Sequence, residues 1–207
     1  MRTLLAIDRA VTTVQLRRWG LLDAATWLRL PQVTYTVRTR TTQRASGVDL
    51  TFVCADADTA GQASRELMHY AGLAEVRQQY DLSKRPGLRW RHIDERRTES
   101  KADAEILGPP GDLRPDTVVE FDAGYSTQIV QIKLEAFAVG GYTGMIWATS
   151  SLGRARNIHR QFTALEDKGL LQTADIIYVN FWDDGDPYVL SPRNHKAVKL
   201  TWSARAT

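Results

Sequence analysis

The alternation of apolar and polar residues along the chain predicts a mixed α/β protein. Apolar positions recur with helical spacing from residue 59 to about 82, and again from a cap at Ser126 or Thr127 to about Ala138. A third helix is predicted over 151–169. Strands are indicated at five runs, LRWRHI, ADAEIL, TVVEFDA, GMIWATSS and ADIIYVNFW. This order of elements is typical of a mixed sheet with helices on its faces.

The first third of the chain has a different pattern. Two short helices are predicted at TVQLRRWGLL and DAATWLRL, and the runs VTYTVRTRT and VDLTFVCA alternate as the strands of a hairpin. We therefore expect a small N-terminal region at residues 1–58, for which a reduced winged helix is one interpretation. The α/β core is expected at residues 59–207.

Composition narrows the class of protein. The 207 residues are 43% hydrophobic and 25% charged, which is ordinary for a globular chain. No apolar run approaches the roughly 18 residues that cross a bilayer, and the N-terminus lacks a signal-peptide pattern. We therefore expect a cytoplasmic protein without a membrane partner.

Cys54 is the single cysteine, which excludes an internal disulfide. The net charge of +3 permits an acidic partner such as nucleic acid.

A charge falls where the predicted helix after TVVEFDA should be apolar. Lys133 lies in the middle of the arc formed by residues such as Ile129, Val130 and Phe137. A buried ammonium group is costly unless it is paired. Either its aliphatic stem packs while its head reaches solvent, or a carboxylate or phosphate lies nearby.

Carboxylates break the apolar pattern in the same region. Glu120 and Asp122 share one face of a strand, because strand side chains alternate. Asp103 lies one strand earlier and would approach Glu120 if the two strands form a hairpin. Glu75 falls on the apolar stripe of the first long helix. Together with Lys133, these residues favour a functional site over scattered structural ion pairs.

Five segments between residues 66 and 160 follow one another in a recognisable order: HYAGLAEVRQQY, ADAEIL, VEFDAGYS, IKLEAF and MIWATSSLGRARNI. This arrangement resembles the PD-(D/E)XK nuclease superfamily, and within it the replication-relaxation proteins. In that superfamily a helix bearing Glu precedes a hairpin that carries an Asp and an (Asp/Glu)-X-Lys. The resemblance implies a restriction-endonuclease-like mixed sheet flanked by helices. It also implies a metal-dependent nuclease that cleaves or nicks DNA in plasmid, phage or mobile-element processing.

The resemblance also implies roles for the five charged residues. Asp103, Glu120 and Asp122 would bind Mg²⁺ or Mn²⁺, Lys133 would orient a water or stabilise negative charge, and Glu75 would serve a second metal. The sequence departs from the family pattern because Asp122 occupies the usual lysine position. A lysine moved to the neighbouring helix, Lys133, would restore the pattern.

A rival register fits the literal family pattern. It uses Pro115-Asp116 with the triplet Gln131-Ile132-Lys133, and it requires TQIVQIK to be a strand. The Ser/Thr cap and the helical apolar arc of that segment favour Asp103 instead.

Two arginine groups are candidates for DNA contact: Arg154, Arg156 and Arg160 after MIWATSS, and Arg38, Arg40 and Arg44 on the early hairpin. Arginines on a solvent-exposed face that binds no ligand would give the same sequence pattern. Two further functions stay open. One is a non-catalytic DNA-binding replication accessory on the same fold. The other is a protein-interaction or structural α/β domain whose acids and lysine form internal ion pairs. The resemblance also permits a homodimer.

Overall fold

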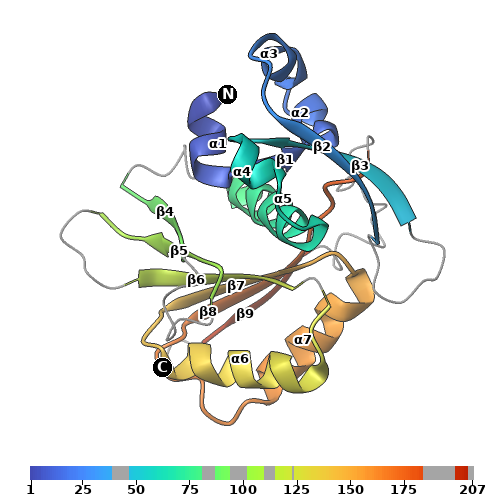
Figure 1. Ribbon diagram of the computed structural model, residues 1–207. Coiled ribbons are helices and arrows are strands. Elements are labelled where there is room, and N and C mark those ends of the chain that lie inside the picture. Colours follow the sequence, from blue (N-terminus) through green and yellow to red (C-terminus); the bar gives the residue numbers. More distant parts are fainter. Residues whose placement is uncertain are drawn as a thin grey trace.

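The computed structural model describes residues 1–38, 47–80, 87–93, 102–109, 115–122, 124–183 and 199–204. This part of the chain forms an α/β protein with seven helices, a three-stranded antiparallel sheet and a six-stranded mixed sheet (Figure 1). The prediction of a mixed α/β fold is therefore confirmed. Among the described residues, no helix combines the length and the hydropathy needed to cross a bilayer.

The small sheet lies in the N-terminal third. Its region comprises α1 (Arg2–Asp8), β1 (Ala10–Thr12), α2 (Thr13–Arg18), α3 (Leu22–Trp27), β2 (Gln32–Arg38) and β3 (Gly47–Cys54). The strand order is β1-β3-β2, and all pairs are antiparallel. The two short helices and the hairpin were predicted correctly. A capping box between Thr12 and Gln15 begins α2. The pattern did not reveal α1 or the three-residue β1.

The large sheet has the strand order β4-β5-β6-β7-β8-β9. Its strands are β4 (Arg89–His92), β5 (Ala104–Leu107), β6 (Pro115–Asp122), β7 (Gly144–Thr149), β8 (Thr173–Tyr178) and β9 (Lys199–Ser203). Strands β6, β7 and β8 are parallel, and the other pairs are antiparallel. The parallel strands are joined by the helices α6 (Thr127–Val139) and α7 (Leu152–Ala164). All five predicted strands are present, and β9 is an addition. Helix α7 ends earlier than predicted.

One helix lies between the two sheets (Figure 1). The segment predicted as a single helix from residue 59 divides into α4 (Ala57–Ala60) and α5 (Ser64–Tyr80). On one face of the large sheet, Phe121 packs in a cluster that also holds Phe52 of β3 and Leu67 of α5. A Cβ on Gly72 of α5 would lie 2.6 Å from the Phe121 ring, so the absence of a side chain permits this close approach.

The opposite face of the large sheet is covered by α6 and α7. Val118 and Trp147 pack there with Leu134 of α6. Alternation along β6 therefore directs Glu120 and Asp122 toward the α6–α7 layer, as the sequence predicted.

Candidate functional site

Of the two alternatives for Lys133, the structure shows the nearby carboxylate. Its Nζ atom lies 2.5 Å from Oε1 of Glu120. The Glu120 side chain is fully buried, and that of Lys133 is 15% exposed. A carboxylate on the adjacent strand, rather than an escape to solvent, therefore accounts for a lysine on the inner side of α6.

Asp103 is positioned by the β5–β6 pairing. The two strands are antiparallel, with Ala104 opposite Val119, so Asp103 is brought beside Glu120 at the end of β5. Its Oδ2 accepts a hydrogen bond from the Phe121 backbone N–H at 2.7 Å. The hairpin predicted for Asp103 is thus confirmed.

The rival register is wrong, because TQIVQIK lies within α6 rather than in a strand. The side chain of Asp116 lies outside the described residues.

Glu120 sits in an electrostatically unfavourable place. Burial raises the pKa of Glu120 well above its usual value, the nearby Asp103 carboxylate raises it further, and Lys133 lowers it only in part. The second carboxylate oxygen of Glu120, Oε2, is buried and has no hydrogen-bond partner among the described residues. Such an atom is rare in native structures, and the Tyr125 hydroxyl is the group that lies near this carboxylate besides Lys133.

Tyr125 covers the lysine. Nζ of Lys133 lies 5.0 Å from the centroid of the Tyr125 ring, a cation–π distance. Burial and the adjacent Glu120 raise the pKa of Tyr125, so its hydroxyl stays protonated.

Asp122 anchors the turn that holds Tyr125. Its Oδ1 accepts hydrogen bonds from the backbone N–H groups of Gly124 and Tyr125, at 2.7 and 2.8 Å. Its Oδ2 lies 2.5 Å from Nε of Arg154, which also donates to the Tyr125 carbonyl. Both carboxylate oxygens of this predicted metal ligand are therefore engaged. Arg154, predicted to contact DNA, points inward to this turn.

Glu75 has other partners. It accepts hydrogen bonds from Nε2 of Gln15 at 2.8 Å and from an Arg18 guanidinium nitrogen at 3.0 Å, which tie α2 to α5. The α5 residue that contacts Asp103 is His69, whose Nε2 lies 2.9 Å from Oδ1 of Asp103. Glu75 is six positions after His69 in the sequence, so the two side chains point about 120° apart around the helix. Sequence reasoning missed His69, although it opens the HYAGLAEVR segment.

A metal would find few ligands in the protein alone. In the described ranges, no group of three or more His, Cys, Asp and Glu side chains is arranged to hold an ion. Of the three predicted ligands, Asp103 and Glu120 are adjacent, and Asp122 is bound to Arg154.

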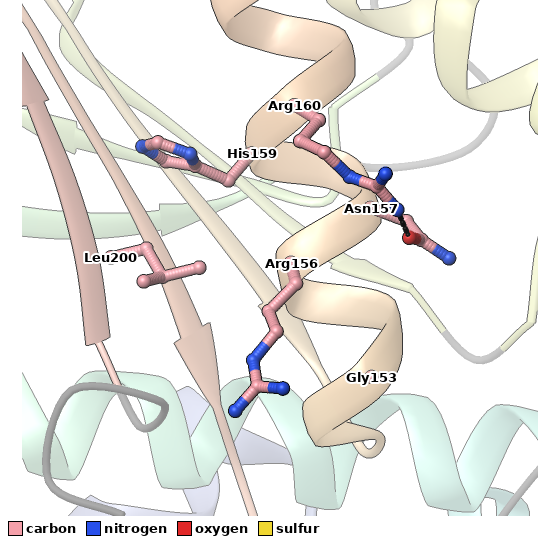
Figure 2. A pocket seen from close by; sticks show the side chains of 6 residues that line it. All are labelled: Gly153, Arg156, Asn157, His159, Arg160 and Leu200. Atoms are coloured by element: carbon pink, nitrogen blue, oxygen red, sulfur yellow. Dashed lines mark hydrogen bonds between the residues drawn. The ribbon is translucent and has the colours of Figure 1, made fainter.

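A basic pocket of about 490 Å³ lies beside α7 (Figure 2). It is lined by Arg156, His159 and Arg160 with Asn157, Gly153 and Leu200 of β9. Arg160 donates a hydrogen bond to the Asn157 side chain. On the early hairpin, Arg38 is exposed on β2, whereas Arg40 and Arg44 lie outside the described residues.

We expect Glu120→Gln to raise the melting temperature at pH 8. Because the folded-state pKa of Glu120 is raised, its contribution to stability is fully present below the unfolded-state pKa and is lost as the pH rises through the folded-state value. Glutamine resembles the protonated acid and removes this loss. In thermal unfolding measured from pH 4 to 8, the stability of Glu120→Gln relative to the unchanged chain should grow as the pH rises. The difference should stay within the roughly 0.5–3 kcal/mol typical of single substitutions. An advantage independent of pH would contradict the explanation.

The structure therefore places Lys133 and Tyr125 beside Glu120, and His69 beside Asp103, whose carboxylate is near enough to raise the pKa of Glu120. It assigns Glu75 to a different set of contacts. Comparisons with protein-family models, with curated proteins and with solved structures find no match for this chain.

Proposed function

We propose that this chain is a DNA-binding protein with a PD-(D/E)XK-like core, which cleaves or nicks DNA phosphodiesters with the help of Mg²⁺ or Mn²⁺. The observation that carries the proposal is the triad of Asp103, Glu120 and Lys133. An Asp at the end of one strand and a Glu on the next are completed by a lysine whose Nζ lies 2.5 Å from the glutamate. That lysine comes from the following helix instead of from position 122.

The order of elements around the triad supports this reading. A helix, α5, precedes the antiparallel meander β4-β5-β6, and α6 then leads to the parallel strand β7. This is the succession expected of a restriction-endonuclease-like core. Asp103 immediately precedes the second of these three strands, and Glu120 lies on the third.

The N-terminal region supports the DNA partner. The succession α1-β1-α2-α3-β2-β3 with sheet order β1-β3-β2 is that of a winged helix, in which α3 would be the DNA-facing helix and β2–β3 the wing. Residues 1–54 hold eight arginines and three aspartates, a net charge of +5. Residues 55–207 hold 19 basic and 21 acidic residues, a net charge of −2. The cationic excess that a phosphate backbone attracts is thus confined to the winged-helix-like region.

The acid pair fits a magnesium ion that binds together with DNA. Mg²⁺ is usually held by one or two carboxylates, with waters and substrate phosphates completing its shell. Asp103 and Glu120 would supply the carboxylates, in place of their present contacts with His69 and the Tyr125 hydroxyl. When bound, the ion would lower the pKa of a coordinated water and neutralise phosphate charge.

The remaining residues would act on the substrate or hold the site. Lys133, oriented by Glu120 and by the Tyr125 ring, would stabilise negative charge on the phosphate. The Asp122–Arg154 pair would fix the turn that carries Tyr125.

A non-catalytic DNA-binding accessory is the second candidate, and one observation favours it. Glu120 is fully buried against Lys133, and both oxygens of Asp103 have partners, the Phe121 backbone N–H and His69 Nε2. A site that has become purely structural would have these features. Such a protein would bind DNA but would neither bind divalent metal at this site nor cleave.

The test is relaxation of a supercoiled plasmid by the intact chain with Mg²⁺ or Mn²⁺, together with calorimetric titration of Mn²⁺. We expect divalent-dependent nicking and measurable metal binding. DNA binding without either result would favour the second candidate, and no binding of DNA at low salt would reject both.

We expect the arginines of the α7 pocket to make a salt-dependent contribution to DNA affinity. Arg156→Gln and Arg160→Gln should each weaken binding and reduce the slope of log affinity against log salt by about 1, because each removes one phosphate contact. Fluorescence anisotropy over a salt series measures this. The matched control is Arg89→Gln, since Arg89 lies on β4 at the opposite edge of the sheet from β9. An equal loss in the control would show that only net charge matters.

A further inference from the structure

Helix α3 presents an aromatic side chain to solvent. Trp27 is 82% exposed, whereas the chain's other tryptophans, such as the fully buried Trp147, are buried or partly buried. Tryptophan is usually highly buried on average, so this exposure is informative. Asp23 and Thr26 are exposed beside it, and together they form the outer face of α3. In Figure 1, α3 stands at the end of the N-terminal region that is farthest from the large sheet.

A cation follows the tryptophan two residues later in the chain. Arg29 is exposed and adopts a φ of 49°, in the left-handed region that follows many helix C-termini. Glycine adopts this conformation at lower cost than any residue with a Cβ atom. Arg29 therefore places an exposed cation at a position where glycine would be less strained.

We propose that Trp27 and Arg29 form a binding surface for an unpaired nucleotide of DNA, with the indole stacked on the base and the guanidinium on an adjacent phosphate. This inference rests on the DNA-binding function proposed above. The net charge of +5 in residues 1–54 attracts the backbone. Within a duplex the faces of the bases are covered by their neighbours, and the grooves offer only base edges. An exposed indole therefore gains the most stacking free energy from a base that is already unstacked.

The substrate class that follows is DNA with a single-stranded end or a fork rather than uniform duplex. The decisive experiment compares the affinity of the full chain for a blunt duplex and for the same duplex with an overhang of roughly ten nucleotides, the scale of single-strand binding sites. We expect tighter binding to the overhang. Trp27→Ala should reduce affinity for the overhang by roughly 5- to 150-fold, the equivalent of one stacked base. It should reduce affinity for the blunt duplex much less, and Trp27→Phe should retain most of the preference.

Two further variants separate a contact with DNA from damage to the fold. Arg29→Gly should weaken binding to the overhang without lowering the melting temperature, because glycine suits the φ of 49°. The control is Val139→Ala, which trims a side chain on α6 that is 78% exposed and should alter neither affinity nor stability.

Several results would overturn the inference. Equal binding of the intact chain to both DNAs would do so, as would an equal loss by Trp27→Ala on both, which would indicate a groove contact. Either result would still be compatible with the proposed DNA-binding function. If the intact chain binds no DNA of any form at low salt, the proposed function fails as well.

Discussion

Replacing Glu120 with glutamine should slow divalent-dependent plasmid nicking by roughly a thousandfold, the scale seen when a charge-stabilising group is removed from an active site. Glutamine keeps the length of the side chain and an oxygen that can accept from Lys133, but it has no negative charge to attract a metal ion. Asp103→Asn should have a similar effect for the same reason. The measurement is the rate at which supercoiled plasmid becomes nicked circle.

Lys133→Met distinguishes the role of the lysine from that of the acids. Methionine preserves the packing of the aliphatic stem on α6 but removes the ammonium group that lies 2.5 Å from Glu120. We expect nicking to fall while Mn²⁺ binding, followed by calorimetry, is retained or strengthened, because the competing positive charge is gone. Loss of both metal binding and stability would instead indicate that Lys133 has a structural role.

The matched control for these substitutions is Glu105→Gln. Glu105 is also a buried glutamate, but it lies on β5, where Arg91 and the Tyr142 hydroxyl donate hydrogen bonds to it. Because it takes no part in the proposed site, its replacement should leave nicking unchanged. Nicking at the wild-type rate in both Asp103→Asn and Glu120→Gln would exclude this site as the catalytic centre. A loss as large in Glu105→Gln would point to damage to the sheet.

Arg77→Met should lower the free energy of unfolding by about 3–5 kcal/mol at pH 7, the usual cost of leaving a buried charge without its partner. Asp8 at the end of α1 is fully buried, and Arg77 of α5 contacts both of its oxygens, at 2.7 and 2.5 Å. The substitution leaves this carboxylate without its guanidinium partner and weakens the attachment of α1 to α5. Urea unfolding measures the change.

The pH dependence of the same variant follows from the pKa of Asp8. Burial raises this pKa, and the Arg77 guanidinium counteracts the rise. For a carboxyl group with a raised pKa, the contribution to stability is fully present below the unfolded-state pKa and is lost as the pH rises through the folded-state value. Without Arg77 this loss of stability with rising pH is larger. The difference in unfolding free energy between Arg77→Met and the unchanged chain should therefore shrink on acidification below neutral pH.

A double substitution completes this test. Asp8→Leu combined with Arg77→Met should recover most of the stability at pH 7, since an apolar pair of similar volume often replaces a buried ion pair without loss. If the double variant is as unstable as Arg77→Met alone, packing at α1 rather than the unpaired charge explains the effect. A defect in Arg77→Met that stays constant with pH would lead to the same conclusion.

Local patterns allowed the core of the candidate site to be predicted. Alternation along β6 placed Glu120 on the face toward α6, and the cap at Ser126 with the apolar arc of α6 placed Lys133 opposite it. The β5–β6 hairpin brought in Asp103 because the two strands are close in sequence. Each of these inferences depends on the period of a helix or strand, or on one short connection, and such features are encoded locally.

What the sequence determined by itself is therefore the set of helices and strands with marked periodicity, and the face on which each charge lies. Only the tertiary structure decided which charges meet. Asp122 pairs with Arg154, 32 residues away, Glu75 with Arg18, 57 residues away, and His69 with Asp103. The short β1 exists because it pairs with β3. Contacts of this kind depend on how distant segments pack, and a free carboxylate and a paired one look the same in a sequence.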